Sequence, residues 1–339
     1  MKRIFLPAIL LCLISFNTFS QEYKILNRFP VPGSGGWDYL VAEPQTGRLF
    51  ISHGSEVNVI NEKTGALLGT IPDTKGVHGI ALASELGKGF ISNGRDSSVT
   101  VFDLKSLATI TKVQVTGLNP DAILYDSFSH SVFVFNGRTK NATVIDAKTN
   151  KVTATIALEG KPEFAATNTK GKVFVNIEDK NKISVINTAT LKVEANWSIA
   201  PGEEASGLAI DLDKNRLFAV CDNKLMIALD ADSGKLIGKA TIGEGPDAVC
   251  FDPSFKRIYS SNGEGTITVI QEENEKDFKV VETIPTQKGA RTMTIDPVNH
   301  HLYLSAAEYG DKPEATKENP HPRPAIKDGT FIILDIVKN

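Results

Sequence analysis

A unit of about 42 residues recurs seven times along this 339-residue chain and leaves few architectures open to it. Two of the units read PDAILYDSFSHSVFVFNGRTKNATVIDAKTNKVTATIALEGK and PDAVCFDPSFKRIYSSNGEGTITVIQEENEKDFKVVETI. The equivalent residues that open the units, spaced by 40 to 44 positions, are Asp38, His78, Asp121, Glu163, Ser206, Asp247 and Arg291. Repetition at this period is typical of folds in which each unit buries its apolar faces against its neighbours.

Each unit contains four short runs that have the composition of β-strands. In the third unit these runs are residues 122–125, 132–135, 142–146 and 152–158. They are rich in Val, Ile, Thr and Phe, which favour strands, and Gly, Asn, Asp and Ser fill the gaps, which favours turns. No helical periodicity of useful length is present. The sequence therefore predicts an all-β fold, a seven-bladed β-propeller with four-stranded blades.

The two ends of the repeat predict how the ring closes. The seventh unit contributes MTID, HLYLSA and TFIILDIV and has no fourth strand of its own, whereas residues 23–29 form a spare strand ahead of the first unit. We expect this strand to pair beside residues 330–336 and to complete the last blade, which removes an exposed sheet edge. Residues 21–339 are therefore interpreted as one propeller domain.

Residues 1–20 have the pattern of a secretory signal peptide. Two basic residues precede an apolar stretch over positions 4–16, and small residues precede Gln21. We expect cleavage after Ser20 and a periplasmic or secreted protein. Because the stretch is short and contains a proline, we do not expect it to span a membrane.

Charge and composition exclude other classes of protein. The chain is 41% hydrophobic, too apolar for a disordered protein. Its formal net charge is −3, so it has no basic surplus to attract nucleic acid or an anionic membrane. We expect a monomer with no membrane association, and nucleic-acid binding is the least favoured function. Cys221 and Cys250 lie in apolar strand-like runs, where buried free thiols are expected.

One unit carries a family resemblance. The segment GKPEFAATNTKGKVFVNIEDKNKISVINTATLKVEANWSI is similar to the YVTN-type repeat of YncE-like β-propellers. The shared features are Gly-x-Pro before the first strand, an aromatic-Val-x-Asn second strand, and V-x-V-I-D/N before a turn that contains Thr. The fifth unit departs from this pattern, with CDNKLMIALD, and the seventh carries an insertion. The resemblance covers residues 23–337 and implies a secreted seven-bladed propeller without a defined chemistry.

The residues that open the units are the best candidates for a functional site. In a propeller, the loop before each inner strand and the loop between the second and third strands open on one face. The predicted rim residues on this face are Trp37, Asp38, His53, His78, Asp121, Glu163, Asp247 and Arg291. An ionisable ring at a channel mouth is a plausible binding site, for a small polar ligand or a protein partner. An ordinary wet rim remains an open alternative, because buried charge is unfavourable.

A divalent metal is the second interpretation of the rim. His78, Asp121 and Glu163 lie on three consecutive units, and imidazole and carboxylate groups are ligands for Mg, Mn, Ca or Zn. Such a site would support a hydrolase or lyase reaction, for example on a lactone. The sequence predicts no further cofactor and no catalytic residue outside this group.

Residues 308–329 form a long insertion in the seventh unit. It connects the predicted second and third strands, so it should emerge on the rim face. Long loops in compact repeats are usually functional or disordered. Its HPRP core places His321 and Arg323 between prolines, stiff enough to lie across an acidic channel mouth as a lid. The alternative is a solvated polar loop that has no part in function.

Overall fold

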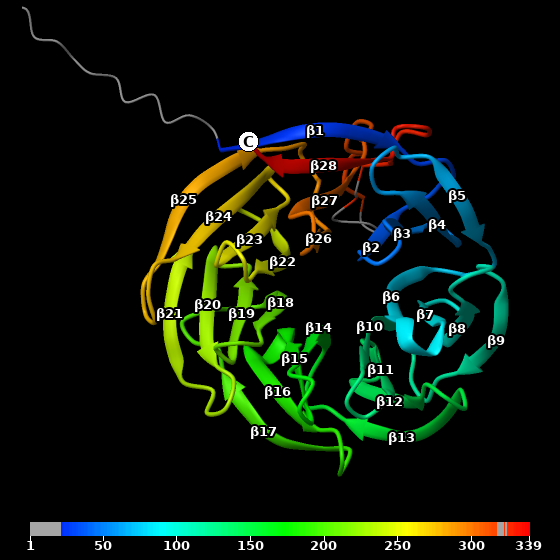
Figure 1. The fold of residues 1–339 in the computed structure, drawn as a ribbon, viewed down its shortest axis with the longest axis horizontal. Coiled ribbons are helices and arrows are strands. Elements are labelled where there is room, and N and C mark those ends of the chain that lie inside the picture. The colour runs from blue at the N-terminus through cyan, green and yellow to red at the C-terminus, as the bar shows by residue number, and fades with distance from the viewer. Residues whose placement is uncertain (1–21, 317–321, 323) are drawn as a thin grey trace, which may run out of the picture.

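The computed structural model describes residues 22–316, 322 and 324–339. Its strands form seven four-stranded antiparallel sheets arranged around a central axis, as Figure 1 shows. The helical segments in the described part of the chain are two short 3₁₀ turns, Ser84–Leu86 and Glu178–Lys180. The predicted all-β, seven-bladed propeller is confirmed. The predicted signal peptide, residues 1–20, lies outside the described residues.

In blades 1 to 6, four strands follow one another in chain order from the axis outward. Blade 1 contains β2 (Trp37–Glu43), β3 (Arg48–His53), β4 (Glu56–Asn61) and β5 (Leu67–Ile71). Blade 2 contains β6 (Val77–Ala83), β7 (Lys88–Asn93), β8 (Ser98–Asp103) and β9 (Thr109–Gln114). Blade 3 contains β10 (Pro120–Asp126), β11 (Ser131–Asn136), β12 (Asn141–Asp146) and β13 (Lys151–Ala157). Blade 4 contains β14 (Pro162–Thr167), β15 (Lys172–Ile177), β16 (Lys182–Asn187) and β17 (Lys192–Ser198).

The remaining blades continue the same order until the ring closes. Blade 5 contains β18 (Ala205–Asp211), β19 (Arg216–Cys221), β20 (Leu225–Asp230) and β21 (Leu236–Thr241). Blade 6 contains β22 (Pro246–Asp252), β23 (Arg257–Asn262), β24 (Thr266–Glu272) and β25 (Phe278–Pro285). Blade 7 contains β26 (Met293–Asp296), β27 (His301–Ala306), β28 (Ile332–Lys338) and, as its outermost strand, β1 (Tyr23–Pro30).

The position of a strand in its blade explains its sequence pattern. The middle strands β11 and β12 are buried at every position except their ends, because neighbouring blades cover both faces of the sheet. The outermost strand β17 alternates between exposed and half-buried residues, because only one of its faces meets another blade. The apolar cores therefore lie between blades, as where the rings of Phe50 and Phe102 approach to 5.8 Å.

The spare N-terminal strand closes the ring as predicted. β1 runs antiparallel to β28, with a register from Tyr23 opposite Lys338 to Pro30 opposite Ile332. Tyr23 is 1% exposed and its hydroxyl lies 2.8 Å from that of Tyr259 in blade 6. β1 therefore both completes blade 7 and packs against the preceding blade.

Side-chain bonds on the face opposite the rim connect consecutive blades. The Thr167 hydroxyl in blade 4 donates to the Asp126 carboxylate in blade 3 at 2.6 Å. His300 Nδ1 in blade 7 lies 2.7 Å from the Asp252 carboxylate in blade 6. Both aspartates are the last residues of inner strands and are fully buried. Each bond therefore fixes the angle between two blades close to the axis. Among the described residues, Cys221 and Cys250 are free and buried, as expected.

A pair of buried carboxyl groups lies at the seam between blades 7 and 1. Glu62 is 4% exposed and Asp296 is 1% exposed. The Asn299 amide donates to Glu62 Oε1 at 3.3 Å, whereas no described residue donates a hydrogen bond to Glu62 Oε2. Burial, together with the nearby charge of Asp296, raises the pKa of Glu62 to about 7. The seam is therefore most stable when this carboxyl group is protonated.

This seam gives a testable pH dependence. The folded protein keeps a proton on Glu62 up to about pH 7 that the unfolded chain releases near pH 4.5. Stability should therefore fall as pH rises through this window, by about 3 kcal/mol for this group. The variant Glu62→Gln should lack that loss. Urea unfolding of both proteins at pH 5 and pH 8 measures the difference, with the exposed Glu275→Gln as the control; parallel pH dependence in all three would contradict the prediction.

Candidate functional site

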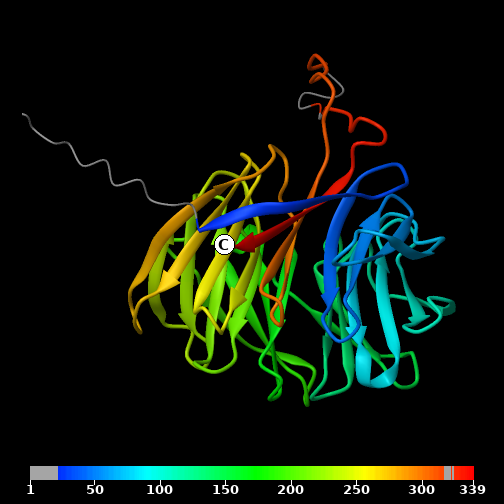
Figure 2. The ribbon, with the colours of Figure 1, turned by 45° about the horizontal axis from the view of Figure 1, so that its top comes forward.

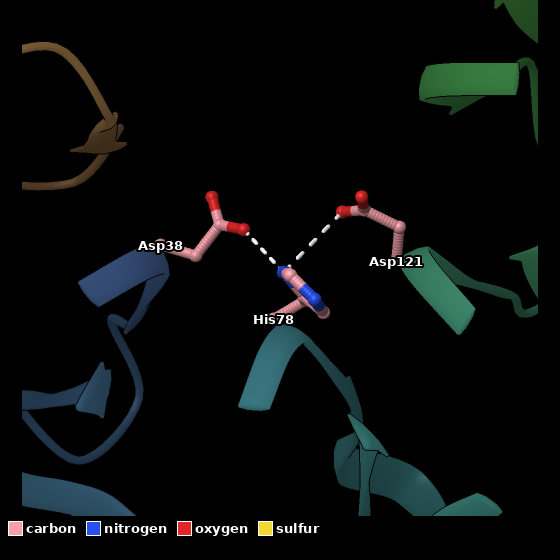
Figure 3. A group of neighbouring side chains, drawn as sticks. All are labelled: Asp38, His78 and Asp121. Carbon is pink, nitrogen blue, oxygen red and sulfur yellow. Dashed lines mark hydrogen bonds and ion pairs between the residues drawn. The ribbon is translucent and has the colours of Figure 1, made fainter. Parts of the chain in front are cut away.

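The rim residues are aimed into the channel mouth by a repeated backbone irregularity. In each of the first six blades, the first residue of the inner strand pairs with the last residue of the second strand. The rim residue comes next and is skipped by the pairing, because the register between the two strands shifts at this point. A β-bulge of this kind bends a strand and redirects a side chain. Asp38, His78 and Asp121 hold equivalent places in β2, β6 and β10, and their side chains converge, as Figure 3 shows.

These three side chains form a group of one imidazole and two carboxylates that could hold a metal ion. His78 Nδ1 lies 2.6 Å from Asp38 Oδ2 and 3.8 Å from Asp121 Oδ1. One ligand atom from each residue lies within 4.8 Å of the other two. Burial lowers the pKa of His78, but the hydrogen bond to Asp38 and the charges of Asp121 and Asp38 outweigh it and raise the pKa. Burial raises the pKa of Asp121 to about 6, and His78 opposes this shift.

Two serines, which the sequence analysis missed, hold the backbone of this group. The Ser52 hydroxyl accepts a hydrogen bond from the Asp38 amide at 2.9 Å. The Ser92 hydroxyl accepts one from the Gly79 amide at 2.8 Å and donates to the Asp121 carbonyl at 2.5 Å in the next blade. Both serines are fully buried. Their only sequence signal is Ser before the last residue of the second strand, in ISHG and ISNG.

On the other side of the ring each carboxylate has a cation from this chain. Lys161 Nζ lies 2.5 Å from Glu163 Oε1 and 2.5 Å from Glu178 Oε2. Burial raises the pKa of Glu163 to about 7, although Lys161 acts against this. Arg291 Nη1 lies 3.9 Å from Asp247, and burial raises the pKa of Asp247 to about 6. The predicted metal ligand Glu163 is therefore bound to Lys161, and Asp38 takes its place beside His78 and Asp121.

An aromatic pair closes the channel below the charged ring. Tyr39 and Phe164 follow Asp38 and Glu163 in their strands, and their ring centroids lie 4.6 Å apart. Beneath them is a cavity of about 210 Å³, lined mainly by apolar side chains from all seven blades. Burial and the surrounding rim carboxylates raise the pKa of Tyr39 well above its ordinary range. The mouth is therefore a funnel above a cavity with a mainly apolar lining.

Trp37 and His53 are not part of this funnel. His53 is 2% exposed, and its Nδ1 lies 3.1 Å from the Pro32 carbonyl. Trp37 stacks on Phe331 with a centroid distance of 5.0 Å. The His53 ring also packs on Phe331, at 4.5 Å. Both residues therefore hold the connection between blades 7 and 1, and their predicted place on the rim does not bring them to the ionisable group.

The described part of the blade 7 insertion stands out from the face of the disc, as Figure 2 shows. Its base is a short antiparallel bridge between Tyr309 and Ile326. The Tyr309 ring lies against Gly289, where a Cβ would come within 2.5 Å of it, two residues before Arg291, so the insertion leaves the disc beside the funnel. The predicted lid residues His321 and Arg323 lie outside the described residues.

Charge is unevenly distributed over the loops around the funnel. The rim loops of blades 5 and 6 contain six charged residues, all exposed: Glu203, Glu204, Asp222, Lys224, Glu244 and Glu264. Backbone bonds join these loops, from the Asp222 amide to Glu203 and from the Glu264 amide to Glu244. Lys224, the one cation, pairs with Glu244 at 3.0 Å. We call this set the acidic sector.

Comparisons with known proteins define the class of fold. No family model matches the chain. A curated relative, the U3 small nucleolar RNA-associated protein 18 homolog of Arabidopsis thaliana, is 24% identical over 156 residues, which are 44% of this chain and 28% of that protein. This chain thus spans under a third of that relative's length.

Solved structures show the same fold at low identity. A chain of the mitotic checkpoint complex has a TM-score of 0.77 at 11% identity, with 100% of both chains covered. The WD40 repeats of RRP9 give 0.73 at 10% identity, covering 94% of this chain and 99% of that one. Hydrazine synthase of Kuenenia stuttgartiensis gives 0.69 at 16% identity, covering 79% and 92%. The chain is a seven-bladed, WD40-like β-propeller.

The comparisons contradict the predicted periplasmic or secreted location. The curated relative is named for association with a small nucleolar RNA, which points to the nucleus. The prediction rested on the composition of residues 1–20 alone, a basic pair followed by an apolar run. In the described part of the chain, no helix has the length and apolar character needed to cross a membrane.

Proposed function

We propose that this propeller is a binding module that holds a protein partner on its rim face, through a basic segment of that partner. The observation that carries the proposal is the acidic sector, where five exposed carboxylates share one lysine. It adjoins the half-buried Asp247 of the funnel in blade 6. Clustered charge of one sign attracts a partner of the opposite sign and orients it.

The similar proteins support a partner-binding role, but they do not identify the partner. One similar structure belongs to a mitotic checkpoint complex, and the curated relative is RNA-associated by name. We favour a protein partner over nucleic acid, because the loops of the acidic sector would repel phosphate groups. The insertion beside the funnel offers further contact area on the same face.

The finer assignment to the YncE-like, YVTN-repeat family is also a proposal, and the role of the repeated asparagine supports it. Asn136, which ends β11, donates to Asn141 at 2.8 Å and to Thr143 at 3.0 Å. Asn93 and Asn262 make equivalent bonds in blades 2 and 6. The asparagine therefore holds the hairpin between the second and third strands, which explains a structural motif without a catalytic role.

The test uses a synthetic peptide with four arginines as the probe. The protein should bind it more tightly than the same peptide with four glutamates, and the affinity should fall as salt increases. Charge reversal by Glu203→Lys and Glu204→Lys together should weaken binding by about tenfold or more. Isothermal titration calorimetry measures both effects.

The matched control reverses two exposed glutamates on the opposite face, Glu273→Lys and Glu275→Lys, which lie in the turn after β24. This variant has the same net charge and should bind the arginine peptide like the parent protein. An equal loss of affinity in both variants would show that the peptide responds only to the net charge of the protein. Preference for a single-stranded RNA oligonucleotide over the arginine peptide would overturn the proposal in favour of nucleic-acid binding.

A further inference from the structure

The rim contains one cluster of metal-ligating side chains in which two carboxylates face a single imidazole. Asp38 and Asp121 lie 19–24% exposed by side chain, on either side of His78. Among the described residues, no lysine or arginine forms an ion pair with either carboxylate. Glu163 and Asp247, across the same funnel, each have a cation from their own chain. On this side of the funnel, the two carboxylates therefore share only the imidazole of His78 among the described residues.

We propose that Asp38, His78 and Asp121 bind one divalent transition-metal ion at the mouth of the channel. The set contains one imidazole nitrogen and two carboxylate oxygens, which suits Zn²⁺ or Mn²⁺ better than Ca²⁺ or Mg²⁺, whose ligands are oxygens. Three protein ligands leave at least one coordination position open toward the funnel.

The backbone around the cluster is organised for such a site. The ligands come from three consecutive blades at one register position, so the rigid ring sets their separation (Figure 3). Ser52 and Ser92 hold the main chain of the first and third ligands. Gly94 leaves room for the imidazole, since a Cβ there would lie 2.7 Å from His78 Nε2. The Nδ1 edge therefore faces the carboxylates, and a metal would replace the Asp38–His78 hydrogen bond.

The proposal does not depend on a protein partner, and its experiment uses the protein alone. Chelator-treated protein should bind one Zn²⁺ per chain in calorimetric titration, and its melting temperature should rise with added metal. Added Co²⁺ should give the visible absorption of a coordinated ion. Each of the variants Asp38→Asn, His78→Gln and Asp121→Asn should weaken binding by at least about 100-fold, while circular dichroism stays unchanged.

Two control variants separate this site from the alternatives. Glu163→Gln should bind Zn²⁺ within a few-fold of the parent, because Glu163 is engaged by Lys161. His130→Gln removes a half-buried histidine that lies 4.0 Å from Glu85, outside the funnel, and tests for adventitious surface binding. The proposal is overturned if the parent binds none of Zn²⁺, Mn²⁺ or Co²⁺ at about 1 mM, or if the three ligand variants bind as the parent does. Loss in Glu163→Gln equal to that in His78→Gln would overturn this ligand set.

Discussion

Removal of residues 22–30, which contain β1, should leave the protein aggregated or melting far below the intact chain. The deletion exposes β28 along its whole length and removes the buried side chains of Tyr23 and Phe29. It also removes two partners of the Arg257 guanidinium, which donates to the Tyr23 hydroxyl at 2.8 Å and pairs with Glu22 at 2.9 Å. Together these losses should exceed about 5 kcal/mol. Thermal melting and analytical size exclusion measure the outcome.

Point variants in the same strand supply the control. Tyr23→Ala should cost about 3 to 5 kcal/mol, since it empties a fully packed aromatic site between blades 6 and 7. Lys24→Ser and Leu26→Ser replace exposed side chains of β1 and should change stability by less than about 1 kcal/mol. If the deletion melts like the parent, β1 does not close the ring in solution.

Glu272→Ala should be the most damaging single charge deletion in the molecule. The Glu272 side chain is 0% exposed and pairs with Arg216 of blade 5, itself 9% exposed by side chain. Lys214 also lies 2.7 Å from Glu272, but its side chain is 38% exposed and can turn to water. Loss of the carboxylate leaves Arg216 buried without its partner, which should cost about 3 to 5 kcal/mol in urea unfolding.

A double variant distinguishes the contribution of the ion pair to stability from the cost of leaving one charge buried without a partner. Arg216→Met with Glu272→Leu replaces both ions by apolar groups and should be much closer to the parent than Glu272→Ala. The exposed pair of Lys224 and Glu244 is the reference, and Glu244→Ala should cost less than about 1 kcal/mol. A small effect of Glu272→Ala would show that water reaches Arg216 freely.

The fold could be predicted because the same pattern of strands and turns recurs in every unit. Seven similar units report the same strand and turn pattern, so a weak signal in one, such as the fifth, is corrected by the others. The closure by residues 23–30 also followed, since only one strand was missing and only one was spare. Local composition and period decide these features, and both are visible in the chain itself.

The candidate site could be predicted only in part. The repeat correctly aligned Asp38, His78 and Asp121 at one level of the channel. It also aligned Glu163, and the choice between Asp38 and Glu163 depends on Lys161, which lies two residues before Glu163 and reaches back to it. Which carboxylate lies beside His78 depends on side-chain rotamers and on distances across the ring. The period of a repeat predicts neither of these.

Trp37 and His53 illustrate a second limit. Both stand next to rim positions in the repeat, yet both are used to anchor the chain where blade 7 meets blade 1. This seam occurs once in the molecule, so no other unit shows what its residues do. Repetition therefore predicts what the blades share, and it misleads at the place where the ring is joined.

The pairing of β1 with β28 has a consequence for the order of events during translation. β1 is made before any blade, and its partner is made some 300 residues later; Asn27 and Asp335, joined by a 2.8 Å hydrogen bond, are 308 positions apart. Six blades can assemble from neighbouring segments while β1 waits unpaired, with Tyr23 and Phe29 in water. Among the described strands, β1 is thus the earliest to be synthesised and the last to pair, and during that interval the nascent chain is most exposed to aggregation.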